Sequence, residues 1–189
     1  MNQRFAPLAY VRVADGTLVS AFLNSTDALG GSHQALGPEV SVAAGIIEAG
    51  AGSKIHIMPF VTQITWVNAG NLKVRMKDAG SPAPYTIELG PQQACITQPG
   101  TFLQLLNPGA EPCHTLYVVS PSYVVEVAAD GRVIYDDAMM VDSDWENLGA
   151  AGWQLGLLGD LAALAKRREQ ALQRLAGRKV EEGSKRGGP

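Results

Sequence analysis

His56 is the side chain in this sequence best suited to chemistry, and Met58 and Gln63 follow it within one short segment, residues 52–70. An imidazole can accept and return a proton near neutral pH, and a glutamine amide can orient a carbonyl or hydroxyl group of a substrate. We therefore predict that His56 is a general acid or base and that Gln63 positions the substrate. The two residues could also be buried polar groups that only satisfy each other or Thr65, and the residue types leave both interpretations open.

The elements that must position these side chains are predicted to be short β-strands. The chain has 189 residues with 21 glycines and 11 prolines, and hydrophobic residues make up 46% of it. About ten strand-like segments lie between residues 41 and 136, each bounded by Gly, Pro or Asp, which is typical of a sandwich or jelly roll. Residues 8–23 alternate around Asp15-Gly16, a dipeptide that favours a hairpin turn. The sequence therefore predicts an all-β body.

The composition changes after Val141, where a helical pattern begins. Ser143 and Glu146 have the spacing of a capping box, and leucines then recur at three- and four-residue steps. These patterns predict an amphipathic helix that ends at Gly177, although Arg168 interrupts its apolar stripe. We divide the chain into an N-terminal hairpin and loop (1–40), a barrel (41–140), a C-terminal helical appendage (141–178) and a disordered tail (179–189).

Charge and composition argue against several functional classes. The formal net charge is −3, so the chain lacks the basic excess that a nucleic-acid-binding surface needs. No continuous apolar stretch has the pattern of a signal peptide or a membrane span, and we expect a cytoplasmic protein with no membrane partner. Cys95 and Cys113 match no zinc or disulfide pattern and are expected to be reduced thiols.

The spacing of several residues resembles the motifs of the cupin superfamily. His56, Met58, Gln63 and Gly70 fall on successive positions of the first cupin motif, with six residues between Gln63 and Gly70. The segment from residue 89 to Asn107, with a Pro-Gly-Thr turn at 99–101, resembles the second motif. The resemblance covers residues 42–120. It implies a cupin-like double-stranded β-helix, a jelly-roll barrel, with an added C-terminal α-helix.

The resemblance also implies where a metal would be bound, and this chain has replaced most of the ligands. The three imidazoles and one carboxylate of the family fall here on His56, Met58, Gln63 and Leu103. A thioether, a neutral amide and a hydrocarbon side chain are poor ligands for divalent first-row metals. We therefore expect no bound metal and no other cofactor.

The barrel implied by the resemblance would bring further side chains into one cavity with His56 and Gln63. Side chains alternate between the two faces of a strand, so residues two apart point the same way. On this alternation the residues expected to line a largely apolar ligand pocket are Met58, Thr65, Val67, Leu103 and Leu105.

Resemblance to cupins implies a small-molecule substrate, and metal-independent members of the superfamily transfer protons. We predict an isomerase, cyclase, epimerase or dehydratase that acts by proton transfer in the barrel cavity. The alternative is a non-catalytic ligand-binding or structural oligomeric cupin. An enzyme needs several polar groups that converge on the cavity, whereas a binding protein needs only shape and one or two hydrogen bonds.

The remaining candidates are assigned structural roles. His33 lies in a glycine-rich loop and is expected at the surface, and His114 near the start of a strand has no assigned role. The apolar helix stripe and the open strand edges predict a homodimer. Four carboxylates are interpreted as a solvated acidic edge beside a helix N-terminus, namely Asp136, Asp137, Asp142 and Asp144.

Overall fold

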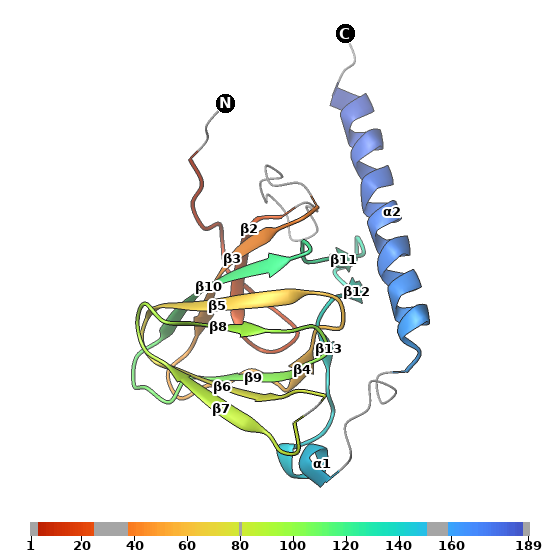
Figure 1. Ribbon diagram of the computed structural model, residues 1–189. Helices are drawn as coiled ribbons and strands as arrows, with labels where there is room; N and C mark the ends of the chain where they lie inside the picture. Colours follow the sequence, from red (N-terminus) through yellow and green to blue (C-terminus); the bar gives the residue numbers. More distant parts are fainter. Residues whose placement is uncertain (1–3, 25–37, 80, 151–158, 187–189) are drawn as a thin grey trace.

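The computed structural model describes residues 4–24, 38–79, 81–150 and 159–186, and most of them form two facing antiparallel sheets (Figure 1). The first sheet has six strands, in the order β1 (Val11–Arg12), β2 (Leu18–Leu23), β3 (Ser41–Ile47), β10 (Cys113–Ser120), β5 (Thr62–Ala69) and β8 (Ala94–Thr97). The second sheet has five, in the order β13 (Met139–Met140), β4 (His56–Ile57), β9 (Phe102–Leu106), β6 (Leu72–Lys77) and β7 (Tyr85–Leu89). The predicted all-β double-stranded β-helix is confirmed.

The main core fills the space between the two sheets because side chains alternate along each strand. On β5, Gln63, Thr65 and Val67 are buried, whereas Ile64 between them is 37% exposed. Leu103 of the facing sheet is fully buried in the same cluster as Val67. Full burial of one such aliphatic side chain contributes roughly 1.5–3 kcal/mol to folding. The repeated alternation therefore stabilises the barrel and gives it one inner face.

The predicted hairpin around Asp15-Gly16 is present and closes one side of the barrel. Strands β1 and β2 pair with Val11 opposite Val19, and Gly16 adopts a φ of 96°, which favours glycine. The Asp15 carboxylate accepts hydrogen bonds from the backbone N–H and the hydroxyl of Thr17, at 2.8 and 2.7 Å. The Asp15 carbonyl accepts a third from the backbone N–H of Lys54, at 2.7 Å, which ties the turn to the start of β4.

Two residues of the matched motifs are explained by the fold itself. Gly70 has a φ of 86°, and a Cβ at this position would lie 2.9 Å from the Cα of Cys113. Asn107 is buried, and its amide donates hydrogen bonds to the carbonyls of Ile47 and Glu111, at 2.9 and 2.8 Å. A larger residue at 70 or an apolar one at 107 would disrupt these loops, so both positions serve the barrel.

Two helices follow the barrel, and their ends differ from the sequence prediction. Helix α1 (Trp145–Ala150) is capped by Asp144, whose carboxylate accepts the N–H of Asn147 at 2.8 Å, so the predicted cap at Ser143 is wrong. Helix α2 (Leu161–Arg186) continues through Gly177, so its predicted end there is wrong and residues 179–186 are helical. One interior glycine costs only about 1 kcal/mol, and the good helix formers around Gly177 outweigh this cost.

Helix α2 packs against the small two-stranded sheet formed by β11 (Val125–Val127) and β12 (Val133–Asp136) (Figure 1). Ala171 and Leu175 on α2 contact Val124 and Tyr135 in one buried cluster. The buried part of the apolar stripe, which the sequence assigned to a dimer interface, therefore covers this chain's own hairpin.

Two ion pairs complete the contact between α2 and the hairpin. The Asp137 carboxylate is fully buried and accepts hydrogen bonds from Arg168, at 2.9 and 3.2 Å. Arg174 donates to both oxygens of the equally buried Glu126. Arg168 thus interrupts the stripe in order to neutralise Asp137, and the prediction that Asp137 lies on a solvated acidic edge is wrong.

Within the described residues, no helix is both long enough and apolar enough to cross a bilayer.

Candidate active site

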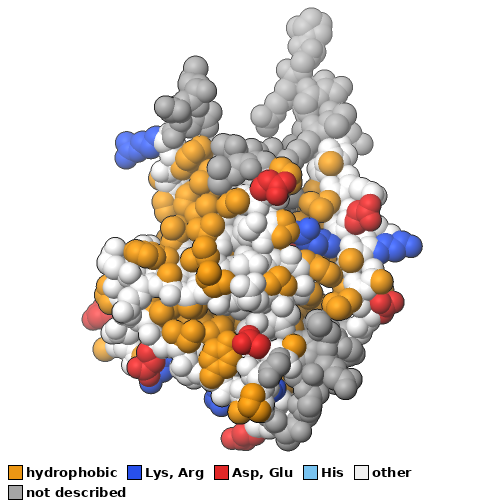
Figure 2. Space-filling model, viewed as in Figure 1, with side chains coloured by type: hydrophobic (Ala, Val, Ile, Leu, Met, Phe, Trp, Pro, Cys, Tyr) orange, Lys and Arg blue, Asp and Glu red, His pale blue; other side chains and the backbone are white. Residues whose placement is uncertain are grey.

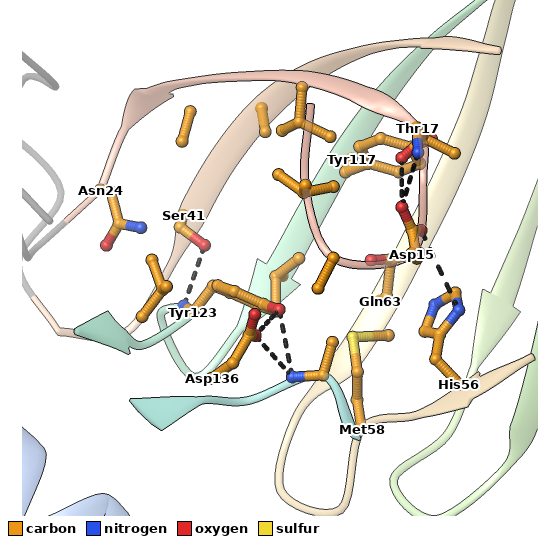
Figure 3. Close-up of a pocket in the computed structure, with 18 of the residues that line it drawn as sticks. Asp15, Thr17, Asn24, Ser41, His56, Met58, Gln63, Tyr117, Tyr123 and Asp136 are labelled. Atoms are coloured by element: carbon orange, nitrogen blue, oxygen red, sulfur yellow. Dashed lines mark hydrogen bonds and ion pairs between the residues drawn. The ribbon is translucent and has the colours of Figure 1, made fainter. Parts of the chain in front are cut away.

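A cavity of about 110 Å³ lies inside the barrel, between β2, β3 and β10 on one side and β4 and β13 on the other (Figure 3). Its wall is mostly apolar, which is typical of small-molecule sites. The polar side chains that line it are Asp15, Thr17, Asn24, Ser41, His56, Gln63, Tyr117, Tyr123 and Asp136.

Four of the seven predicted site residues line this cavity, namely His56, Met58, Gln63 and Leu105. The other three predicted residues, Thr65, Val67 and Leu103, are each fully buried and are not among the described residues of the cavity wall. The alternation along a strand gives the inner face correctly but does not give depth along the barrel, and these three lie in the packed layer. Their predicted contact with a ligand remains a prediction, as do the roles of the other four.

The imidazole of His56 is held in one tautomer. Its Nδ1 lies 3.0 Å from the carbonyl oxygen of Lys54, and a carbonyl can only accept, so Nδ1 carries the hydrogen and Nε2 is unprotonated in the neutral ring. The Asp15 carboxylate lies 4.0 Å from the same Nδ1, and both side chains are largely buried. A proton taken up at Nε2 would therefore place a charged ring close to a carboxylate.

The amide of Gln63 is oriented by one hydrogen bond, from Nε2 to the Thr65 hydroxyl at 3.1 Å. Among the described residues this is its one hydrogen bond, so the amide oxygen is free to accept from a ligand. Figure 3 shows Gln63 beside Asp15 and His56 on the same side of the cavity. The structure therefore brings together the two residues that the sequence selected, but they do not satisfy each other.

A second acid–base pair lies on the opposite side of the cavity, where Tyr123 donates its hydroxyl hydrogen to Asp136 (Figure 3). The backbone N–H of Ala138 donates to both groups, at 2.9 and 3.1 Å. The pKa of Asp136 is raised from 3.8 to about 6, mainly by burial; the hydrogen bonds from Tyr123 and Ala138 oppose this rise, and the nearby charges of Asp137 and Asp15 add to it. Burial also raises the pKa of Tyr123 well above its ordinary value. Asp136 can therefore hold a proton under mildly acidic conditions.

Tyr117 is a third polar group in the cavity, and its hydroxyl has no hydrogen-bond partner among the described residues. The side chain is only 6% exposed, and a Cβ on Gly45 would overlap its ring, so glycine at position 45 makes the space that the ring fills. Burial raises the pKa of the phenol, and the nearby Thr115 hydroxyl opposes this rise. A buried hydroxyl left unpaired costs about 1–3 kcal/mol, which a ligand in the cavity could recover.

The residues at the family's metal-ligand positions do not fit a metal. Leu103 is a fully buried hydrocarbon, and Met58 and Gln63 offer only a thioether and a neutral amide. The Nδ1 of His56 is already hydrogen-bonded, and no group of three or more His, Cys, Asp or Glu side chains in the described part of the chain has the geometry of a metal site. These residues therefore do not form a ligand set for a divalent metal.

Seven polar residues of the cavity were not among the predicted site residues, namely Asp15, Thr17, Asn24, Ser41, Tyr117, Tyr123 and Asp136. Asp15 was interpreted as a turn residue and Asp136 as part of a solvated edge, but both carboxylates line the cavity. His114 faces outward and is exposed, and His33 lies outside the described residues. No local pattern marks these residues as one site, because only the closed barrel brings them together.

Asp136 gives a testable pH dependence of stability. Its pKa is about 6 in the folded state and 3.8 ordinarily, so between pH 4 and 6 the folded protein keeps a proton that the unfolded chain releases. The stabilisation of the folded state by protonated Asp136 is present below about pH 4 and is lost as the pH rises through 6. It amounts to roughly 2–3 kcal/mol. The free energy of unfolding from urea titrations at several pH values should fall over this range, and the fall should be smaller in Asp136→Asn. Equal slopes for the two proteins would contradict this assignment.

Comparisons with known proteins agree with the fold. Oxalate decarboxylase from Lactobacillus farciminis, solved as a formate complex, superposes with a TM-score of 0.53 over 71% of this chain at 15% identity. A protein with a double-stranded β-helix domain from Klebsiella pneumoniae matches 60% of this chain and 84% of its own, with 21% identity and a TM-score of 0.45. The cupin domain of Cnp3 from Schizosaccharomyces pombe matches 45% of this chain and 55% of its own, with 15% identity and a TM-score of 0.40.

Each likeness covers only part of the two chains compared. This chain spans about a third of the length of the decarboxylase, 33%, and all three identities are low. No family model and no curated protein matches the sequence. The superposition, the strand order and the two matched motif turns nevertheless agree on one architecture. The chain has the double-stranded β-helix fold.

Proposed function

We propose that the barrel binds a small molecule and that His56 moves a proton to or from it without a metal, as an isomerase, epimerase, cyclase or dehydratase does. The observation that carries this proposal is the state of His56 in the cavity. Its Nδ1–H is hydrogen-bonded to the Lys54 carbonyl, which leaves Nε2 unprotonated in the neutral ring and able to accept a proton, and Asp15 lies 4.0 Å from Nδ1. Asp15 is a positioning residue in this scheme, because it acts through His56.

The cavity also supports the second half of such a reaction. An isomerisation or elimination needs an acid as well as a base, since the proton removed from one atom must be matched by a proton given to another. Tyr123 and Asp136 face the cavity from the side opposite His56 and share a hydrogen bond (Figure 3). His56 would take the proton from carbon, and the pair would protonate the leaving oxygen or the opposite face of the carbon. Gln63 would orient the substrate through its amide oxygen.

The experiment that tests the proposal is solvent exchange. Chelator-treated protein in D₂O is incubated with a panel of small ketones, hydroxy ketones and sugars, and loss of substrate C–H signals is followed by proton NMR. A proton-transfer enzyme exchanges the reacting hydrogen with solvent, so at least one compound should exchange with the wild type far faster than with His56→Gln. A panel in which both proteins exchange at the same rate contradicts the proposal.

A second candidate function, a structural oligomeric cupin, is favoured by the outer face of the six-stranded sheet. Strands β3, β10, β5 and β8 are adjacent and contain no Asp, Glu, Lys or Arg. Ile64 and Ile96 are cross-strand partners on this face and are 37% and 55% exposed, with Trp66, Leu116 and Val118 half-buried beside them. In Figure 2, hydrophobic side chains gather over the part of the view that holds these strands.

We therefore propose a homodimer in which this outer face, rather than helix α2, is covered by a second copy. A contiguous apolar face of this kind is unusual on a monomer, and a two-fold axis can pair the same face of two copies. Ile96→Lys should shift the molar mass measured by light scattering from dimer toward monomer. The matched control is Val133→Lys, which is 50% exposed on β12 and should leave the mass unchanged. A wild-type protein that is monomeric at micromolar concentration would contradict the proposal.

A further inference from the structure

The two carboxylates of the cavity wall make its charge negative. Two carboxylates, Asp15 and Asp136, are part of its wall, whereas no Lys or Arg occurs among the described residues that line it. The sequence reinforces this asymmetry, because residues 13–53, which supply β2, β3 and the turn at Asp15, contain neither Lys nor Arg. Any ligand in the cavity therefore meets a negative potential from two directions (Figure 3).

Two arginines close to these carboxylates in the sequence or the fold are engaged elsewhere. Arg12 pairs with Glu48 at 3.1 Å and donates to the Gly16 carbonyl at 2.6 Å. Arg168 is bound to Asp137, the neighbour of Asp136, and to the Ser122 carbonyl, at 2.9 Å each. Neither guanidinium lines the cavity. In the described part of the chain, the partners of the two wall carboxylates are hydrogen-bond donors and the His56 ring, and neither carboxylate forms an ion pair with a Lys or Arg.

Tyr117 independently indicates that a ligand supplies what is missing. Its hydroxyl is buried with no hydrogen bond of normal geometry to the described residues, and a phenol oxygen can accept a hydrogen bond from a ligand N–H. The rings of Tyr117 and Tyr123 also offer aromatic faces, which attract cations. A carboxylate or phosphate ligand would instead be buried beside like charges with no cation to pair with it, which is strongly unfavourable.

We propose that this cavity selects a small organic molecule carrying a protonated amine, held between Asp15 and Asp136 with Tyr117 as a hydrogen-bond partner, and that it rejects carboxylates and phosphates of the same size. The apolar remainder of the wall contacts the hydrocarbon part of the ligand. This inference rests on the proposed function only in taking the cavity as the ligand site. It names the substrate class independently of whether a proton is transferred.

The test uses three probes that share a branched four-carbon skeleton: isobutylamine, isobutanol and isobutyrate. Dissociation constants are measured at neutral pH from chemical-shift changes of ¹⁵N-labelled full-length protein. Isobutylamine should bind at least about tenfold more tightly than isobutyrate, the effect expected of a partly screened charge pair. Asp15→Asn and Asp136→Asn should each reduce this preference several-fold, and Tyr117→Phe should weaken the amine more than the alcohol.

The matched control is Asp130→Asn, which removes a carboxylate whose side chain is 67% exposed at the β11–β12 turn and should leave the preference unchanged. Two carboxylate variants are included so that a loss of folding in one of them does not decide the test. Binding of isobutyrate as tight as that of the amine overturns the inference, as does an amine preference that survives both carboxylate variants, or no binding of any probe. The first two results leave the proton-transfer proposal standing, because that proposal is decided by solvent exchange.

Discussion

His56→Gln should lower the rate of substrate proton exchange by about 10²- to 10⁴-fold, the usual contribution of a general acid or base. Glutamine has a similar reach, and its amide can still donate to the Lys54 carbonyl that now accepts from Nδ1. It cannot take up a proton near neutral pH, so chemistry is lost while the local packing is retained. The melting temperature should therefore change little. The rate is measured by NMR in D₂O with the compound found in the solvent-exchange panel.

His114→Gln is the matched control, because His114 is exposed on the outer face of β10 and should not affect the rate. Asp15→Asn should lower the rate less than His56→Gln and change its pH profile, since the carboxylate acts through the imidazole. An unchanged rate in His56→Gln would remove His56 from the mechanism. A lower melting temperature with an unchanged rate would identify it as a structural core residue.

The second large effect concerns stability. Arg168→Ala should reduce the free energy of unfolding by about 3–5 kcal/mol, the usual cost of removing one partner of a buried ion pair. The Asp137 side chain is fully buried, and the lost guanidinium supplies two of its hydrogen bonds as well as its neutralising charge. The same guanidinium also satisfies the Ser122 carbonyl, at 2.9 Å. Urea denaturation followed by circular dichroism measures the change.

Lys166→Ala is the control for helix α2, because Lys166 is exposed two residues before Arg168 and a surface change of this kind stays within about 0.5 kcal/mol. Replacing both members of the pair, with Arg168→Met and Asp137→Leu together, should cost less than Arg168→Ala alone, since no charge is then left buried. If Arg168→Ala and Lys166→Ala are equally stable, helix α2 is not anchored through Asp137.

The fold could be predicted because its signals are local. Asp15-Gly16 marks a hairpin, and Gly70 and Asn107 occupy positions where the backbone requires a positive φ or a buried amide. The strand alternation also gave the inner face of β5 correctly, with Gln63 inside and Ile64 outside. These features depend on residues close in sequence or on one repeated spacing, and a single sequence contains both.

The rest of the site depends on contacts between distant segments. Asp15 and His56 are 41 residues apart and meet because the first hairpin folds across the barrel beside β4. In the sequence, Asp136 and Asp144 are both acidic residues that precede a predicted helix. In the structure Asp136 lines the cavity, whereas Asp144 caps α1. The likeness to cupins does not help here, because none of these carboxylates occupies a motif position.

The protonation state of the His56 ring tests the central claim of a metal-free base most directly. Long-range ¹H–¹⁵N correlations of the imidazole can be recorded on chelator-treated protein at about pH 8, where an ordinary imidazole is neutral. The His56 signals are identified by their loss in His56→Gln. The structure predicts a hydrogen on Nδ1 and an unprotonated Nε2, with signals unchanged by one equivalent of Zn²⁺. A hydrogen on Nε2, or an Nε2 signal that Zn²⁺ shifts and chelator restores, would contradict the account.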